Sequence, residues 1–140
     1  MTIWNKKGNS AVEEINQASL IRIDRFDTGA GEFPIDSWMD FVHVIKDSLN
    51  IKENDSLLEI GCGAGAFLLP LYKLGIHVYG IDYAESLVNI CKNLIGNTHC
   101  QIAHANKLPH ESHFFDALVS NSVFQYFPDK IYAEEVISEI

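Results

Sequence analysis

Basic residues are scarce in this sequence. Its 140 residues contain 10 lysines and arginines against 19 aspartates and glutamates, which gives a formal net charge of −9 at pH 7. The basic residues are scattered, and Lys6 and Lys7 form the only adjacent pair. Nucleic-acid binding requires a basic stripe facing the phosphates, and an acidic membrane surface requires a similar cluster. The sequence therefore predicts no nucleic-acid partner and no membrane partner.

Cysteines and long apolar runs are also scarce. Three cysteines, Cys62, Cys91 and Cys100, are an odd number at wide spacings, which predicts free thiols in a reducing compartment rather than a disulfide framework. The N-terminal residues Met1–Ile15 contain no apolar segment of signal-peptide length. The longest apolar run, Ala66–Tyr72, is too short to span a bilayer. Together these absences predict a cytoplasmic protein.

Chain length and a hydrophobic content of 47% indicate one globular domain with its own core. Residues 1–33 form a polar lead-in with a helix expected around Ala11–Leu20, and this segment could serve as a substrate cap. Residues 34–140 form the main domain. In the lead-in, Asp24, Asp27 and Glu32 could contact a substrate amine, although a solvated turn is the favoured interpretation.

Strands and helices alternate along the main domain. It opens with an amphipathic helix that places Ile35, Trp38 and Val42 on one face. Strands are expected at Leu57–Ile60, Ile76–Ile81, Thr98–Ala103 and Ala117–Ser120, and further helices at Gly65–Leu74, Ala84–Ile95 and Ile131–Ile140. This order predicts an α/β, Rossmann-like, three-layer αβα fold with a mostly parallel sheet. The last helix has no capping residue at its end, which indicates a truncated sequence.

A glycine-rich loop follows the first expected strand. Gly61 and Gly63 allow a sharp turn and a close approach of a ligand to the backbone, and Asp82, at the end of the second strand, is placed to bind two ribose hydroxyls. Gly61-x-Gly63-x-x-Ala66 also satisfies the dinucleotide-binding pattern. Glu59, however, would repel a pyrophosphate at close range. The loop therefore favours S-adenosylmethionine, which carries an ammonium, a sulfonium and a ribose, over NAD.

Four segments resemble the motifs of one family in that family's order. Leu57–Gly65 resembles the first motif of the class I S-adenosylmethionine-dependent methyltransferases, and Gly80–Ala84 resembles their second, acidic motif. Ala105–Pro109 and Phe115–Phe124 are similar to their third and fourth motifs. The resemblance covers about Leu57 to Pro128 and is specific for fold and cofactor. It implies little about the methyl acceptor.

The resemblance implies roles for the residues of the first motif. The backbone of Gly61, Gly63 and Gly65 would pass the methionine part of the cofactor. Glu59 would act on the cofactor's amino group through the loop or a water molecule. Cys62 is interpreted as a small residue beside the cofactor rather than as a nucleophile.

The later motifs would hold the adenosine part of the cofactor. Asp82 would bind the ribose hydroxyls, Tyr83 would lie against the adenine, and Ala105 would offer its backbone amide to the adenine ring. Many members of the family have an aspartate where His104 stands. Here the adenine amino group would be bound by His104 or by Asn106.

The fourth motif and the end of the chain complete the implied arrangement. The backbone around Ser120 and Asn121 would border the methionine amine. The expected strand order is 3-2-1-4, and the strands that usually follow in the family are missing. The fourth strand would then be an open edge through which the chain could form a homodimer.

The predicted function is methyl transfer to a small-molecule acceptor. No catalytic residue can be named. Two alternatives stay open, a non-catalytic cofactor-binding fragment and an NAD-dependent oxidoreductase. No metal is predicted, since the histidines and cysteine between His99 and His113 do not have the spacing of a zinc site. The aromatic segment Phe124–Phe127 could line the acceptor pocket.

Overall fold

A computed structural model of the chain describes residues 15–26 and 31–140. Its centre is a four-stranded sheet in the order β3-β2-β1-β4. Every neighbouring pair of strands is parallel. The α/β fold and the strand order predicted from the sequence are therefore confirmed. The strands are β1 (Ser56–Ile60), β2 (His77–Asp82), β3 (Cys100–Ile102) and β4 (Ala117–Val119).

The register of the parallel strands brings the predicted motifs together at the carboxyl end of the sheet. Glu59 of β1 pairs with Gly80 of β2 on one side and with Val119 of β4 on the other. Asp82, the last residue of β2, pairs with Ile102 of β3. Because the carboxyl ends of parallel strands all lie at the same end of the sheet, the loops that follow β1, β2, β3 and β4 emerge side by side.

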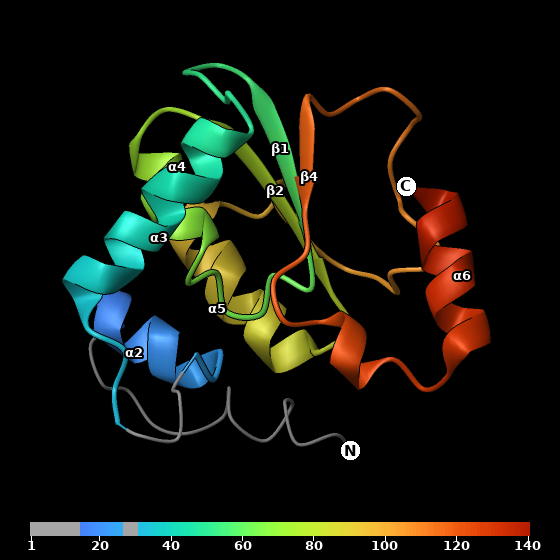
Figure 1. The fold of residues 1–140 in the computed structure, drawn as a ribbon, viewed down its shortest axis with the longest axis horizontal. Coiled ribbons are helices and arrows are strands. Elements are labelled where there is room, and N and C mark those ends of the chain that lie inside the picture. The colour runs from blue at the N-terminus through green and yellow to red at the C-terminus, as the bar shows by residue number, and fades with distance from the viewer. Residues whose placement is uncertain (1–14, 27–30) are drawn as a thin grey trace.

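Helices α3 (Ile35–Ser48), α4 (Leu68–Lys73) and α5 (Glu85–Ile95) lie on one side of the sheet (Figure 1). Helix α2 (Gln17–Ile23) lies beyond the end of α3 and contributes Leu20 and Ile21 to the core of that side. Alternate residues of a strand face opposite sides of a sheet, and accordingly Leu57 and Val78 point into the core beneath these helices. Trp38 of α3 is 1% exposed and packs in the same core, as the helical spacing predicted.

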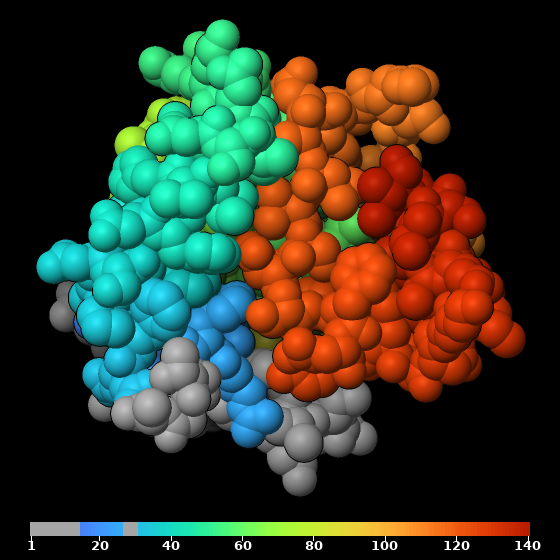
Figure 2. All heavy atoms as spheres, viewed as in Figure 1, coloured from blue at the N-terminus to red at the C-terminus, as the bar shows by residue number. Residues whose placement is uncertain are grey.

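The opposite face carries a smaller core under α6 (Lys130–Glu139), which completes the third layer (Figure 1). Leu58, Ile60 and Ile81 of the sheet pack there with Val136 of α6. A short 3-10 helix, η1 (Phe124–Tyr126), lies on the path from β4 to α6. Figure 2 shows that β4 and the segment after it fill the surface between α3 and α6.

One expected helix begins later than the sequence suggested. The helix expected from Gly65 is α4, which starts at Leu68, because Gly65 has φ +97° and is not helical. Pro70 thus lies in the first turn, where its missing N–H costs no helical bond. Helix α2 starts at Gln17 after an Asn16 cap, whereas part of the expected Ala11–Leu20 helix lies outside the described residues.

Several negative findings apply to the described part of the chain. β4 pairs there with β1 alone, so its other side is an edge of the sheet, and homodimerisation through that edge stays a prediction. Among residues 15–26 and 31–140, none of the helices is long and apolar enough to span a membrane. The same residues contain no group of three or more side chains suited to hold a metal ion.

Candidate functional site

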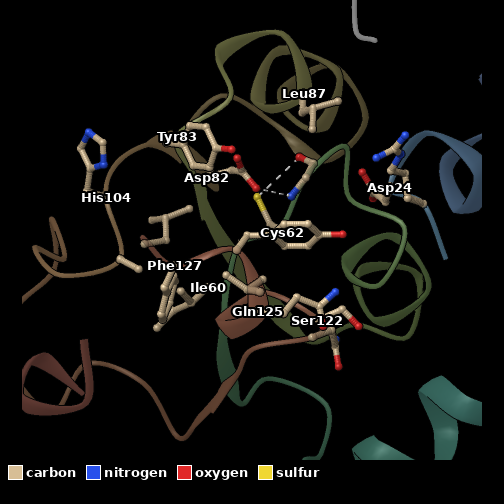
Figure 3. Close-up of a pocket in the computed structure, with 18 of the residues that line it drawn as sticks. Asp24, Ile60, Cys62, Asp82, Tyr83, Leu87, His104, Ser122, Gln125 and Phe127 are labelled. Carbon is tan, nitrogen blue, oxygen red and sulfur yellow. Dashed lines mark hydrogen bonds between the residues drawn. The ribbon is translucent and has the colours of Figure 1, made fainter. Parts of the chain in front are cut away.

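A cavity of about 740 Å³ opens at the carboxyl ends of the strands (Figure 3). The loops after β1, β2 and β3, the segment after β4 and the lead-in all contribute to its wall. Of the predicted site residues, eight line it: Gly61, Cys62, Gly63, Asp82, Tyr83, His104, Ala105 and Asn121. The other four, Glu59, Gly65, Asn106 and Ser120, are not part of the wall.

The glycine loop owes its shape to backbone angles that favour glycine. Gly61 has φ +76° and Gly63 has φ +54°, both in the left-handed region. The N–H groups of Gly61 and Cys62 donate to the carbonyl oxygen of Ile81 at 2.8 and 2.9 Å. The loop therefore turns sharply away from β1 and is fixed to the end of β2.

Asp82 is hydrogen-bonded to the loop and to the start of α5. Its carboxylate accepts the N–H of Gly63 at 3.0 Å and the N–H of Ala84 at 2.8 Å. Burial raises the pKa of Asp82 above its usual 3.8, although these hydrogen bonds oppose the shift. Each carboxylate oxygen keeps capacity for a second hydrogen bond, so Asp82 can also accept from a ligand in the cavity.

Asp24 lies on the side of the glycine loop opposite to Asp82, a position that the sequence did not suggest. Its carboxylate accepts the N–H of Ala64 at 2.7 Å and that of Ala66 at 3.0 Å. The predicted solvated turn is therefore wrong for Asp24, which lines the cavity. Glu32 does form an exposed ion pair with Arg22, and Asp27 lies outside the described residues.

The pKa of Asp24 is raised from 3.8 to about 7, chiefly because the carboxyl is removed from water. Hydrogen bonds from the backbone of Ala64 and Ala66 oppose this shift, and the nearby charge of Asp82 adds to it. The charge of Asp24 therefore changes near neutral pH.

Glu59 is buried beneath the loop, with 2% of its surface exposed. One carboxylate oxygen, Oε1, accepts a hydrogen bond of 3.1 Å from the side-chain amide of Asn121. The other, Oε2, has no hydrogen-bond partner among the described residues. Burial raises the pKa of Glu59 well above its usual value, and the charges of Asp24 and Asp82 act in the same direction.

The predicted adenine-binding residues divide into two groups. Tyr83 is 42% exposed, and it lines the cavity together with His104 and Ala105. Asn106 instead donates to Glu135 of α6 at 2.7 Å, away from the cavity wall. Of the two predicted alternatives for the adenine amino group, only His104 faces the cavity.

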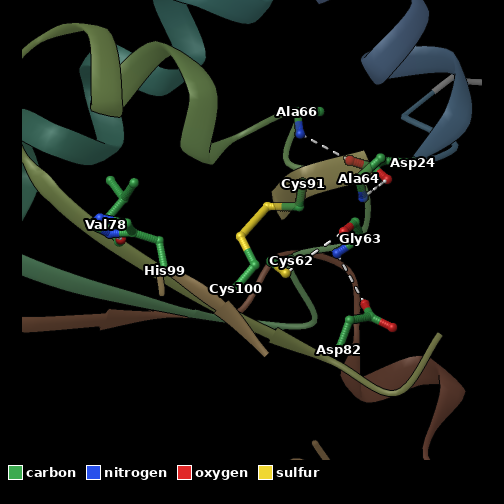
Figure 4. Close-up of a disulfide and its surroundings, with 10 residues drawn as sticks. All are labelled: Asp24, Cys62, Gly63, Ala64, Ala66, Val78, Asp82, Cys91, His99 and Cys100. Atoms are coloured by element: carbon green, nitrogen blue, oxygen red, sulfur yellow. Dashed lines mark hydrogen bonds between the residues drawn. A yellow bond between two sulfur atoms is a disulfide. The ribbon is translucent and has the colours of Figure 1, made fainter. Parts of the chain in front are cut away.

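The cysteine prediction needs a correction. Cys91 of α5 and Cys100 of β3 form a disulfide (Figure 4), so two of the three expected free thiols are paired. Helix α5 folds back onto the sheet and brings these residues to a Cα–Cα distance of 6.4 Å, a proximity that sequence spacing does not reveal. Cys62 is free and buried, and burial raises the pKa of its thiol, which does not favour a nucleophile.

Some wall residues were not predicted as site residues. Phe26 and Phe33 come from the lead-in and its junction with α3, and Val123 follows β4. Of the segment Phe124–Phe127 considered for the acceptor, Gln125, Tyr126 and Phe127 line the cavity, and Phe124 does not. Phe26 and Phe33 could not be found from the sequence, because only folding brings the lead-in over the strand ends.

Comparison with known proteins places the chain in a family. Residues 58–140 match the family model described as a methyltransferase domain. The ubiquinone biosynthesis O-methyltransferase of Bartonella tribocorum is 29% identical over 86 residues, which are 59% of this chain and 35% of that protein. A protein of Methanosphaera stadtmanae named as ribosomal RNA small subunit methyltransferase A is 31% identical over 87 residues, 60% of this chain and 32% of that protein.

A solved structure has the same fold. The magnesium protoporphyrin IX methyltransferase of Synechocystis PCC 6803, with S-adenosylmethionine bound, has a TM-score of 0.60 at 16% identity. The alignment covers 92% of this chain and 72% of that one. The chain spans only about a third of the length of the two curated relatives named above.

The chain belongs to the methyltransferase domain family, because the family model matches more than half of it. The family resemblance and the Rossmann-like fold expected from the motifs are thereby confirmed. The match favours the methyltransferase interpretation over a nicotinamide-dependent oxidoreductase.

Proposed function

We propose that the cavity binds S-adenosylmethionine and that this chain is the cofactor-binding part of a methyltransferase acting on a small molecule. The observation that carries the proposal is the glycine loop held between Asp24 and Asp82, at the strand ends, in a chain of the methyltransferase domain family. A cavity of about 740 Å³ is within the range of small-molecule and cofactor sites.

The residues present fit this cofactor. Asp82 can accept hydrogen bonds from ribose hydroxyls. Tyr83 and His104 line the part of the cavity next to Asp82, where the adenine would lie. Gly61 and Gly63 line the cavity, so the methionine part could pass along their backbone. The carboxyl groups of Asp24 and Asp82 line the cavity and suit a ligand that carries an ammonium and a sulfonium, because a cationic ligand favours their charged forms.

When bound, S-adenosylmethionine supplies a methyl group on a cationic sulfur that leaves as a neutral thioether. The residues of this chain contribute by holding that group in line with the acceptor, since such a transfer depends mainly on proximity and alignment. Asp82 and the glycine loop fix the donor. Val123 and Tyr126 line the side of the cavity on which an acceptor would bind.

The negative net charge of the chain indicates that the methyl acceptor is a small molecule. The net charge of −9 disfavours a polyphosphate such as RNA, although one relative is named as a ribosomal RNA methyltransferase. The apolar walls that Phe26, Phe33 and Tyr126 supply are suited to a compact organic acceptor.

Calorimetric titration with S-adenosylhomocysteine tests the cofactor assignment. Micromolar binding is expected, and Asp82→Ala should weaken it by about 1–3 kcal/mol through the loss of the ribose contact. Asp40→Ala, which removes the same charge from an exposed position on α3, is the matched control and should bind as the wild type does. A folded wild-type chain that binds NAD but not S-adenosylhomocysteine would overturn the proposal. Binding without methylation of any small acceptor would leave the non-catalytic alternative.

A further inference from the structure

We propose that Asp24 determines the specificity of this cavity by binding the α-ammonium group of the methionine part of the cofactor. The proposal rests on the proposed function and deepens it, since it assigns a ligand group to a residue of the lead-in, outside the four motifs.

Asp24 stands at the methionine side of the glycine loop. Asp82 accepts the N–H of Gly63 from one side, and a Cβ atom added to Gly63 would overlap the carboxylate of Asp24 on the other. Figure 3 shows the two aspartates approaching the loop from opposite directions. A ligand whose ribose lies on Asp82 and whose chain crosses Gly63 therefore reaches Asp24 next.

The carboxylate of Asp24 is held in place and still has acceptor capacity. Its two oxygens each accept one backbone N–H, from Ala64 and Ala66 (Figure 4). An ionised carboxylate offers about four lone-pair directions, so each oxygen can accept a further hydrogen bond. An ammonium group can donate up to three. The backbone bonds fix the carboxylate without saturating it.

The ionisable side chains around the loop are mostly acidic, which favours a cationic ligand. Asp24, Glu59 and Asp82 lie close enough that Asp82 raises the pKa of Asp24, and both raise that of Glu59. Arg25 is the only lysine or arginine among the described residues that line the cavity. Glu59 also keeps one buried oxygen without a described partner. A ligand ammonium would relieve this repulsion.

Arg25, the residue after Asp24, carries the charge that a ligand carboxylate requires. It lines the cavity directly after Asp24 and has φ +61°, an angle that non-glycine residues adopt rarely. An amino-acid group carries an ammonium and a carboxylate, and the adjacent Asp24 and Arg25 carry the complementary charges. NAD has no such group, so this end of the cavity distinguishes the two ligands.

The test compares two ligands on Asp24→Asn. S-adenosylhomocysteine carries the ammonium, whereas 5′-methylthioadenosine has the same adenosine and thioether but no amino-acid group. Calorimetry should show S-adenosylhomocysteine weakened about tenfold or more, as expected for loss of a charge-assisted hydrogen bond. Binding of 5′-methylthioadenosine should change less than about twofold, which also reports that the variant is folded.

Asp82→Asn is the matched control and should weaken both ligands, because both contain the ribose. Equal weakening of the two ligands by Asp24→Asn would overturn the proposal and make Asp24 an anchor of the loop alone. Unchanged binding of S-adenosylhomocysteine would also overturn it. If wild type binds neither ligand, the proposed function itself fails, an outcome distinct from both of these.

Discussion

Val123 packs directly over Gly61, so that one of its γ-methyl groups fills the space where a Cβ atom on Gly61 would stand. The two residues belong to different motifs, Gly61 to the loop after β1 and Val123 to the segment after β4. Their contact means that the first turn of the loop and the segment after β4 fit each other only while position 61 is glycine.

Gly61→Ala should therefore destabilise the chain by about 2–4 kcal/mol. The strain of an alanine at φ +76° and the overpacking against Val123 both contribute. Urea denaturation measures the loss. Gly31→Ala is the matched control, since Gly31 has φ +133° but a Cβ there would meet nothing within 4 Å. It should cost at most about 1–2 kcal/mol, and an equal cost at both positions would contradict the role of Val123.

The Glu59–Asn121 hydrogen bond predicts opposite effects for two substitutions. Asn121→Ala should lower the free energy of unfolding by about 1–3 kcal/mol, because it leaves the buried Glu59 carboxyl without its donor. Glu59→Gln keeps an acceptor for Asn121 and removes a group whose charged form is disfavoured by burial. It should be neutral or stabilising at pH 7.5 in urea denaturation. A substantial destabilisation by Glu59→Gln would show that the carboxyl has a structural partner of its own.

Trp38 and Gln17 both donate to the carbonyl oxygen of Ala66, at 3.0 and 2.8 Å. Trp38→Phe should cost about 1–3 kcal/mol for the lost hydrogen bond and the smaller ring, and Gln17→Ala about 0.5–1.5 kcal/mol. With both donors removed the buried carbonyl is unsatisfied, so the double variant should lose more than the sum. Thermal denaturation of the three variants measures this, and strict additivity would argue against the shared acceptor.

Asp24 should make stability depend on pH. Its pKa is about 7 in the folded chain against 3.8 as the ordinary value, so between these values the folded state keeps a proton that the unfolded state releases. The free energy of unfolding contributed by Asp24 therefore falls as pH rises from about 4 to about 7. The groups that face Asp24, namely Asp82, Glu59, Cys62 and Arg25, are unchanged in Asp24→Asn.

Urea midpoints of wild type and Asp24→Asn between pH 4.5 and 7.5 measure this dependence. Wild type should lose stability relative to the variant as pH rises through the window. A difference between the two proteins that is constant with pH would mean that Asp24 does not titrate there. Asp40→Asn, an exposed carboxyl on α3, is the control and should run parallel to wild type.

The sheet could be predicted because its signals are local. Leu57–Ile60 is a short apolar run that leads into glycines, and Gly75 and Gly96 follow their helices with positive φ angles, +79° and +121°. The start of α4 could not be predicted in the same way. Gly65 lies inside an apolar run that is compatible with a helix, and only the structure shows that it has φ +97° and lies against Cys91, whose Sγ would be 3.1 Å from a Cβ atom added at Gly65.

The sequence alone determined the glycine loop and the acids beside it, since Glu59, Gly61, Gly63 and Asp82 stand at fixed distances from strand ends that hydrophobic patterning reveals. The family followed from the resemblance of four motifs in that family's order. Tertiary structure decided the rest of the site. It brought Asp24 across 40 residues to the loop amides, closed Val123 over Gly61 and paired Cys91 with Cys100. These contacts depend on how helices pack on the sheet and how the lead-in crosses its edge. Packing is set by the shape of the whole core, and no local pattern encodes it.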